Sequence, residues 1–236
     1  MKYWVDLHIH SCLSPCAEED MTPNNIVNMA LIKELDIIAI TDHNSARNLE
    51  AVIEAGNRQG LLVVPGMELC TAEEIHLVCY FPDLERALSF EKLVYSNLYP
   101  IENREDIFGA QIIMDHYDNV IGRETRLLSG ACKMDVETAI KEVRSLNGIV
   151  IPAHIDRQSY SMLNTLGAIP SEYCFKYLEL SRDCTVDKFL SENPSLNSYK
   201  YIHSSDAHFL GNILEREVSL DLIDRTVESL MDCLRQ

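Results

Sequence analysis

Apolar positions along the chain recur with two different periods, which predict strands separated by helices. Short, almost continuous apolar runs at residues 36–42 and 60–66 are typical of buried strands. Between such runs the apolar residues lie three or four positions apart, as in a predicted helix that begins after Thr22 and carries Ile26 and Ala30 on one face. Strands that alternate with helices indicate βαβ units and a parallel sheet, which can close into a barrel.

The pattern changes after Pro82. Residues 83–147 contain no clear buried strand, so we expect helices and loops there, with a last helix from about residue 135 that stops at Gly148. Strand patterns resume at 148–154, 176–181 and 200–208. We therefore predict a single α/β domain over residues 1–236, with a mostly helical insertion at 83–147 that forms a cap over one end of the sheet.

The composition is that of an ordinary globular protein. The chain has 236 residues, of which 47% are hydrophobic and 24% charged, and no stretch approaches the roughly 20 apolar residues of a membrane span. The chain starts in a strand pattern without the segments of a signal peptide, and its eight cysteines are scattered without a CxxC pair. We therefore expect a cytoplasmic protein without membrane contact, in which most cysteines are buried thiols.

The net charge of the chain argues against anionic binding partners. Acidic residues outnumber basic ones by 37 to 20, which gives a formal net charge of −17. Such a surface repels nucleic acids, whose binding requires Lys and Arg to neutralise phosphates, and it also repels anionic membranes. The charge therefore argues against long nucleic acid as a partner.

The histidines carry the strongest chemical signal. The first predicted strand ends in the motif DLHIHS, and because side chains alternate along a strand, His8 and His10 lie on one face. Six of the eight histidines stand at ends of predicted strands, with carboxylates close by. Parallel strands would bring these side chains together at one mouth. The histidines are His8, His10, His43, His76, His154 and His208, and the carboxylates are Asp6, Asp42, Glu68 and Asp206.

Imidazole and carboxylate groups without a thiolate motif indicate catalytic metal ions and not a structural zinc. Ten candidate groups are too many for one ion, so we expect two or three divalent ions, of zinc, manganese or iron, that share a bridging carboxylate. Such centres hold both the attacking and the leaving oxygen of a phosphate ester, and they lower the pKa of bound water.

Taken together, the motifs resemble the polymerase and histidinol phosphatase (PHP) domain family. DLHIHS, TDHNS, PGMEL, PAH and SDAH occur in that family's order between residues 6 and 208. The amidohydrolase superfamily also begins with an HxH strand, but its members ordinarily end in a lone aspartate and many carry a bridging modified lysine. Here the last motif contains both Asp206 and His208, and the candidate bridge is Glu68, which favours the PHP family.

The resemblance implies a distorted, TIM-like (β/α)7 barrel with a trinuclear metal centre. By that resemblance, Glu68 bridges the first two ions. The first ion is also held by His8, His10 and Asp206, and the second by His76 and His154.

The third ion of the family would be held by His43 and His208 with a group from the loop after the first strand. Family members often have a histidine or an aspartate there. In this chain the loop has no histidine, and the competing residues are Cys16, Glu18, Glu19 and Asp20. We favour Glu18 because of its distance from the helix start at Thr22.

Residues beside the motifs have candidate supporting roles. Arg157, just after the PAH motif, could offer a bidentate fork to phosphate or be a surface arginine paired with an acidic neighbour. Asp6 and Asp42 could orient metal-bound imidazoles. His203 and His116 are expected to be an ordinary core histidine and an ordinary histidine of the insertion.

The motifs and the resemblance together predict a metal-dependent hydrolase of phosphate esters that acts by attack of metal-bound hydroxide. Its substrate would be a small phosphorylated metabolite, a nucleotide or a short oligonucleotide, drawn in by the metal ions and by cationic residues such as Arg157, Arg123 and Arg126. The alternative is a non-catalytic, metal-containing PHP module that serves as a nucleotide sensor or a scaffold. The candidate catalytic groups are Asp206, His208, Glu68 and Arg157.

Overall fold

Three parallel strands form the centre of the sheet in the computed structural model, which describes residues 1–236. They are β1 (Lys2–Ile9), β2 (Ile37–Ile40) and β3 (Leu62–Cys70), connected by helices α1 (Pro23–Ile32) and α2 (Leu49–Gln59). The Thr22 side chain accepts a hydrogen bond from the Asn25 N–H, and Pro23 takes the first helical position. This N-terminal cap explains why α1 begins where the sequence predicts.

The fourth strand, β4 (His76–Tyr80), runs antiparallel both to β3 and to β7 (Ile149–Pro152). The expectation of a parallel sheet is therefore wrong on this side of the fold. Only residues 71–75 connect β3 to β4, and a parallel crossover needs about a dozen residues or more. As a consequence His76 starts its strand, and it still lies at the edge where β3 ends.

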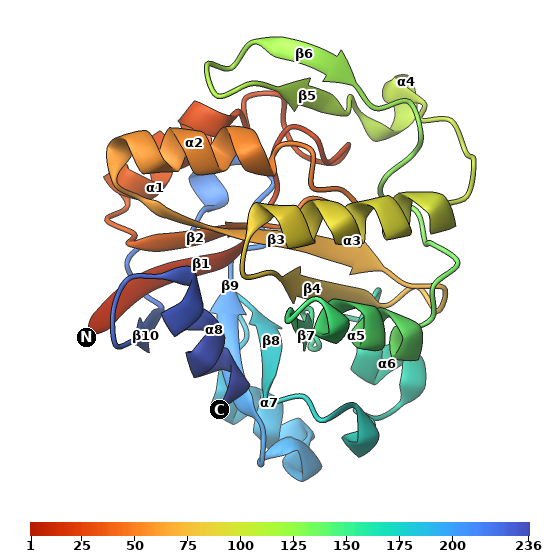
Figure 1. Cartoon of the computed structure of the whole chain (residues 1–236). Helices are drawn as coiled ribbons and strands as arrows, with labels where there is room; N and C mark the ends of the chain where they lie inside the picture. The colour runs from red at the N-terminus through yellow and green to blue at the C-terminus, as the bar shows by residue number, and fades with distance from the viewer.

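Two further strands, β8 (Tyr177–Ser181) and β9 (Lys200–Ser204), form a separate parallel pair. The larger sheet has the order β10-β1-β2-β3-β4-β7, with β10 (Ser219–Asp221) antiparallel to β1. A few hydrogen bonds near the strand ends connect the pair to this sheet, among them those from His10 N to Ala207 O and from Ile155 N to Glu179 O, both at 2.9 Å. The fold is thus mixed α/β with a curled sheet that stays open (Figure 1), and the complete (β/α)7 barrel is not seen.

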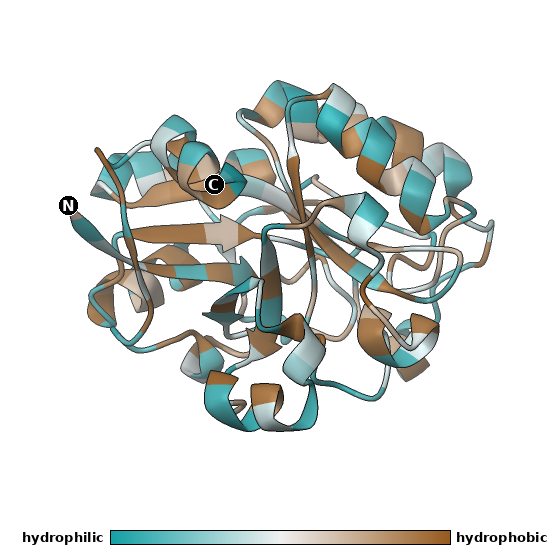
Figure 2. Cartoon of the chain, turned by 90° about the horizontal axis from the view of Figure 1, so that it is seen from below, coloured by the Kyte–Doolittle hydropathy of each residue, from teal (hydrophilic) through white to brown (hydrophobic).

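Apolar residues of the central strands point alternately to two sides of the sheet. Ile38 and Ile40 of β2 pack in a cluster of 43 buried residues that includes apolar residues of α1 and α2. Ile37 and Ala39 belong to a second cluster of 16, to which α8 (Val227–Arg235) adds Leu230. Figure 2 shows strands that are largely brown and surrounding helices in which teal and brown residues alternate. Burial on both faces explains the continuous apolar runs of β2 and β3.

Residues 83–147 contain strands as well as helices. The antiparallel hairpin of β5 (Ile112–Met114) and β6 (Val120–Arg123) corrects the expectation of helices and loops alone. The hydrophobic pattern does not predict this hairpin, because β5 has only three residues and β6 is largely exposed. The Asn48 side chain holds β5 by accepting from Met114 N and donating to Ile112 O, both at 3.0 Å. Figure 1 shows the hairpin above α2.

The remaining elements are short or lie at the periphery. None of the helices combines the length and apolar composition that crossing a membrane requires. The helices are α3 (Leu84–Asn97), α4 (Glu105–Phe108), α5 (Val136–Ser145), α6 (Met162–Leu166) and α7 (Val186–Glu192), and the 3₁₀ turns are η1 (Ser171–Tyr173), η2 (Pro194–Leu196) and η3 (Leu210–Asn212).

Candidate metal centre

The six strand-end histidines come together at one edge of the sheet, as the sequence predicts. Five of them are buried, and His208 is partly exposed at the rim. His8 and His10 lie at the end of β1, with their Nε2 atoms 3.2 Å apart. Two imidazoles at this short distance would repel one another if both were protonated. The arrangement therefore needs anions nearby or a cation between them.

Glu68 is the carboxylate at the centre of this cluster. Its Oε1 lies 2.8 Å from His76 Nδ1 and 3.2 Å from His154 Nε2. Its Oε2 lies 2.9 Å from His43 Nδ1 and 3.4 Å from His10 Nε2. The two oxygens therefore face different sets of imidazoles, which is the arrangement that a bridging carboxylate needs.

Asp206 is the second carboxylate of this cluster. Its Oδ1 lies 3.3 Å from His8 Nε2 and 3.1 Å from His10 Nε2. Its Oδ2 accepts a hydrogen bond of 2.6 Å from Arg157, whose Nε donates to the Ser181 hydroxyl at 3.1 Å. One carboxylate thus faces the imidazoles and also fixes the guanidinium.

These side chains form three groups whose ligand atoms all lie within 4.8 Å of one another inside each group. His154 is outside these groups, but its contact with Glu68 places it beside the third. The groups are His8, His10, Glu68 and Asp206; His10, His43 and His208; and His43, Glu68 and His76.

Unpaired polar atoms show that the cluster fits metal ions. Seven buried side-chain N or O atoms in the chain have no hydrogen-bond partner, and five of them belong to this cluster. Buried polar groups are almost always paired, but here imidazole nitrogens and carboxylate oxygens face one another, as His43 Nδ1 faces Glu68 Oε2 at 2.9 Å, without hydrogen-bond geometry. Ligand atoms around a cation are arranged in this way. Neutral imidazole nitrogens and carboxylate oxygens are suitable ligands for zinc, manganese or iron. The five atoms are His43 Nδ1, Glu68 Oε2, His76 Nε2, His154 Nδ1 and Asp206 Oδ1.

The protonation of the cluster follows from its charges. Burial by itself would raise the pKa of Glu68, but His76, His8 and His43 outweigh it and hold the pKa well below its usual range. Burial also lowers the pKa of His8, yet Glu179, Glu68 and Asp206 raise it well above its usual value. For His76 burial dominates and the pKa falls to about 4. Metal binding would therefore displace protons from some imidazoles, because a ligating nitrogen must be free.

Two cluster residues have strained backbones. His154 has φ of 30° and Asp206 has φ of 51°, in the left-handed region that residues with a Cβ rarely adopt. Such strain persists only where surrounding contacts fix it, and it concentrates at functional sites. Both residues directly follow or lie close to strand ends, so the strain turns their side chains into the cluster.

Glu179 is a functional residue that the sequence reasoning missed. It is buried in β8 and accepts from His8 Nδ1 at 3.0 Å and from the His154 N–H at 3.0 Å. If His8 binds a metal ion, this carboxylate would keep the remaining proton on Nδ1 and leave Nε2 free for the ion. The available signal was an acidic residue between Leu178 and Leu180 in an otherwise apolar strand.

Glu179→Gln is expected to weaken metal binding roughly 10- to 100-fold, because the amide no longer holds the His8 tautomer with a full negative charge. Calorimetric titration with Zn²⁺ measures the change, and Glu192→Gln, an exposed glutamate of α7, is the control. Equal zinc affinity in the Glu179 and Glu192 variants would rule out this orienting role.

Asp42 contacts the cluster indirectly, whereas Asp6 binds backbone N–H groups. The Ser14 hydroxyl donates to Asp42 at 2.7 Å and contacts His10 Nδ1 at 2.9 Å, so Asp42 positions an imidazole through Ser14. Asp6 accepts from Ser205 N and Leu214 N and contacts no imidazole. Of the two aspartates, only Asp42 therefore reaches an imidazole, and it does so through Ser14.

The structure places the four remaining candidates away from the metal groups. Arg123 pairs with Glu105, and Arg126 stacks on Tyr95, so neither is part of the centre. His203 contacts a backbone carbonyl, and His116 pairs with a glutamate at the surface.

The loop after β1 adds neither Cys16 nor Glu18 to the three ligand groups. Glu18 is exposed and belongs to none of the three ligand groups. Cys16 is exposed and belongs to none of these groups either. Partial burial raises the pKa of its thiol, but the His208 and His43 imidazoles outweigh it and lower the pKa to about 5. The preference for Glu18 is therefore not supported by the geometry.

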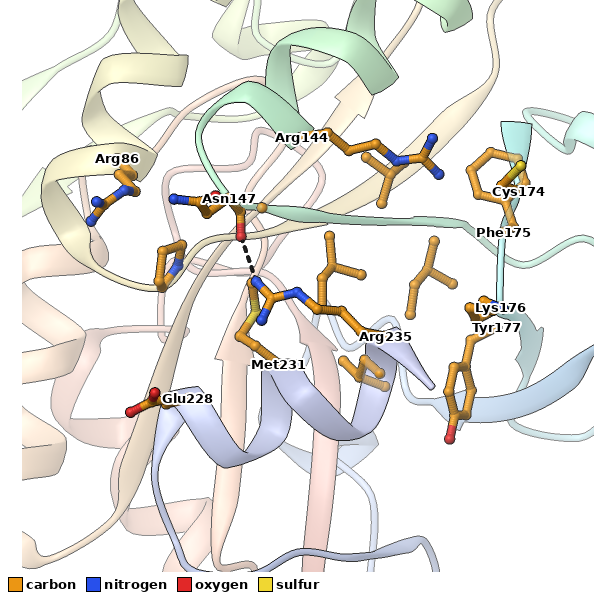
Figure 3. Close-up of a pocket in the computed structure, with 16 residues that line it drawn as sticks. Arg86, Arg144, Asn147, Cys174, Phe175, Lys176, Tyr177, Glu228, Met231 and Arg235 are labelled. Carbon is orange, nitrogen blue, oxygen red and sulfur yellow. Dashed lines mark hydrogen bonds between the residues drawn. The ribbon is translucent and has the colours of Figure 1, made fainter. Parts of the chain in front are cut away.

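The cluster opens into a small cavity of about 140 Å³, which Arg157 and Tyr160 help to line. A larger hollow of about 760 Å³ lies elsewhere, between β7 and β8, and shares no lining residue with the cluster. Figure 3 shows Arg144 and Arg235 extending over it from α5 and α8, with Arg235 donating to Asn147 O at 2.9 Å. This hollow contains no histidine, so it cannot be the metal centre.

Comparison with known proteins identifies one family. The family model described as the PHP domain matches residues 6–164, which is more than half of the chain. No curated protein matches the chain.

Solved structures share the fold at low sequence identity. Endonuclease Q from Pyrococcus furiosus, a lesion-specific endonuclease, superposes with a TM-score of 0.75 at 19% identity over 100% of this chain and 56% of its own. A structure of Endonuclease Q with a 27-mer duplex substrate, with an abasic lesion at its active site, gives 0.70 and 18% over 100% and 57%. This chain therefore spans just over half the length of Endonuclease Q.

A third structure matches over nearly its whole length. It is a protein from Bifidobacterium adolescentis for which metal-dependent phosphoesterase activity has been proposed, with a TM-score of 0.61 at 17% identity over 98% of this chain and 95% of its own. At such identities these likenesses establish the fold alone.

Proposed function

Because this chain belongs to the PHP domain family, we propose that it is a metal-dependent phosphoesterase whose centre is the cluster around Glu68. The observation that carries the proposal is the set of five buried, unpaired ligand atoms in that cluster. Two or three divalent ions of zinc, manganese or iron bound there would act as Lewis acids toward phosphate and water. Glu68 would bridge two of them, and His8, His10, His43, His76, His154, Asp206 and His208 would be the other ligands.

Residues around the ions would bind and orient the phosphate. Arg157 lines the cavity, and Asp206 and Ser181 hold its guanidinium in a fixed direction. A preorganised guanidinium stabilises negative charge that develops on phosphate oxygens. Tyr160 stacks on His76 with ring centroids 4.4 Å apart and covers part of the cavity, which limits the access of bulk water.

Arg157→Lys is expected to lower kcat/KM roughly 10- to 100-fold, since the ammonium keeps the charge but loses the planar fork and a charged hydrogen bond. Steady-state kinetics with a phosphate ester measure the loss. Arg182→Lys is the matched control, because Arg182 is an exposed arginine that directly follows Ser181 in the sequence. Equal kcat/KM values for both variants would show that Arg157 has no role in binding or turning over the phosphate ester.

A simple assay separates the enzyme from a non-catalytic module. The protein is freed of metal with a chelator, reloaded with Zn²⁺, Mn²⁺ or Fe²⁺, and incubated with chromogenic phosphate monoesters and diesters. The proposal predicts turnover that depends on the metal and disappears with chelator. Stoichiometric metal binding without turnover of any ester would instead favour a PHP module that acts as a nucleotide sensor or scaffold.

We further propose that the substrate is a small phosphorylated molecule, a nucleotide or a short oligonucleotide. The support is a 140 Å³ cavity in which Arg157 is the one Lys or Arg, within a chain of net charge −17. The likeness to Endonuclease Q, which has been captured with duplex DNA, makes nucleic acid the alternative substrate. A cytoplasmic location stays a prediction from the sequence.

The two substrate classes differ in their response to salt. We expect faster turnover of a short phosphorylated ester than of a long single strand or a duplex with an abasic site, with little salt dependence. Faster turnover of the long strand or the duplex, falling steeply as salt rises, would show a groove that follows phosphates and would overturn the small-substrate proposal.

A further inference from the structure

We propose that the hollow between β7 and β8 is a second binding site, for a small molecule in which a phosphate group is attached to a flat apolar body. The hollow has a volume of about 760 Å³ and shares no lining residue with the metal cavity. Volumes of this size are typical of small-molecule sites. The inference therefore does not rest on the proposed metal centre.

The hollow exists because the sheet is open at this place. β7 is the last strand of the larger sheet and pairs only with β4, whereas β8 pairs only with β9. The hydrogen bond from Ile155 N to Glu179 O connects the two segments on the side of the metal centre. At the starts of the two strands, Ile149 and Tyr177 line the hollow instead. The free edge of β7 offers backbone N–H and C=O groups that have no strand partner.

Apolar side chains form the wall of the hollow. Half of its 16 lining residues are hydrophobic, among them Ile149 and Ile151 of β7, Phe175 and Tyr177 at the start of β8, and Leu234 of α8. Each of these five side chains is at most 8% exposed, so packing holds the wall in place. A preformed wall lets a flat apolar group bind without the cost of ordering side chains.

The charges around this wall are the reverse of those of the whole chain. Acidic residues outnumber basic ones by 37 to 20 in the chain, whereas four cations and one carboxylate line the hollow. The carboxylate, Glu228, lies at the opposite end of the hollow from Lys176 in Figure 3. The four cations are Arg86, Arg144, Lys176 and Arg235.

Two of the four cations have no carboxylate that neutralises them. Arg86 and Arg235 each form an ion pair with an aspartate three residues earlier in the chain. Arg144 donates to the backbone carbonyl of Tyr173 and forms no ion pair, and Lys176 forms none either. A guanidinium and an ammonium group are the usual ligands of phosphate. Their two charges match the two negative charges of a phosphate monoester.

The fluorescence anisotropy of 1-naphthyl phosphate tests this site in the metal-free protein, where a chelator prevents hydrolysis. We expect saturable binding that is roughly 10-fold tighter than that of the competitors 1-naphthol and inorganic phosphate, which each offer one half of the ligand. Arg144→Gln and Lys176→Gln should each weaken it about 10-fold, because each removes a charged hydrogen-bond donor. Arg225→Gln, at an exposed arginine that does not line the hollow, is the control with the same change of charge.

The outcomes distinguish this site from other ways of binding. Equal losses in Arg144→Gln, Lys176→Gln and Arg225→Gln would show an unspecific attraction to cations and overturn the inference. A loss in Arg157→Gln that Arg144→Gln and Lys176→Gln do not share would place the ligand in the metal cavity and overturn it too.

The competitors and the metal-loaded protein complete the test. Inorganic phosphate or 1-naphthol that binds as tightly as 1-naphthyl phosphate, or no saturable binding at all, would contradict a site that recognises both halves of the ligand. Binding with the expected losses in a protein that turns over no phosphate ester when loaded with metal would support the inference and count against the proposed function.

Discussion

Glu68→Gln is expected to remove at least one metal ion per chain and to lower kcat/KM by roughly 10²–10³-fold, while the chain stays folded. The two carboxylate oxygens face different imidazole sets, and a neutral amide offers one weak oxygen ligand in place of two charged ones. The protein should tolerate the change because the amide has nearly the same shape and because the imidazoles no longer need a counter-charge when they are neutral. Elemental analysis, kinetics and far-ultraviolet circular dichroism measure the three effects.

The control for this variant is Glu91→Gln. Glu91 is also a buried glutamate, and it accepts from the Ser45 hydroxyl at 2.7 Å and from Arg47 Nε at 3.2 Å, outside the cluster. Its replacement should leave metal content unchanged. Wild-type metal content in Glu68→Gln would show that Glu68 is not a bridge.

Asp42→Asn is expected to lower the free energy of unfolding of the metal-free protein by about 3 kcal/mol. Asp42 is buried and accepts from Ser11 N at 2.7 Å, from the Ser11 hydroxyl at 2.6 Å and from the Ser14 hydroxyl at 2.7 Å. An asparagine has one acceptor oxygen, so at least one of these donors, each in a buried place, loses its partner. Because Ser14 also positions His10, metal affinity should fall in the same variant.

Urea unfolding of metal-free protein measures the stability change. Asp115→Asn is the control, because this aspartate accepts from Tyr117 N and Asn119 N in an exposed turn where water can replace a lost partner. Its loss of stability should be clearly the smaller one. Equal unfolding midpoints for the two variants would show that the loop after β1 does not depend on Asp42.

The position of the motif side chains could be predicted because the hydrophobic pattern indicates where strands end. A short apolar run with a histidine or a carboxylate near its end indicates both the strand and the place of that side chain, as for His8 in β1 and Glu68 in β3. The side chains therefore lie at one edge of the sheet even where the predicted direction of the strand is wrong. His76 shows this, because it begins an antiparallel strand and still reaches Glu68.

What could not be predicted depends on contacts between distant segments. Nothing in the pattern of β8 shows that Glu179 points at His8, a residue 171 positions away. The hairpin of β5 and β6 is short and is held by the side chain of Asn48 in another element. The positions of Cys16 and Glu18 depend on the path of a loop that one backbone hydrogen bond, from Glu18 N to His208 O, helps to fix.

The most direct test of the account is an anomalous difference map from crystals of the protein loaded with Zn²⁺. The account predicts two or three peaks between the side chains around Glu68, with zinc–nitrogen distances of about 2.0–2.1 Å and one peak on each side of the Glu68 carboxylate. No peak within this cluster in a map that shows zinc elsewhere, or a single peak that Glu68 does not touch, would contradict it.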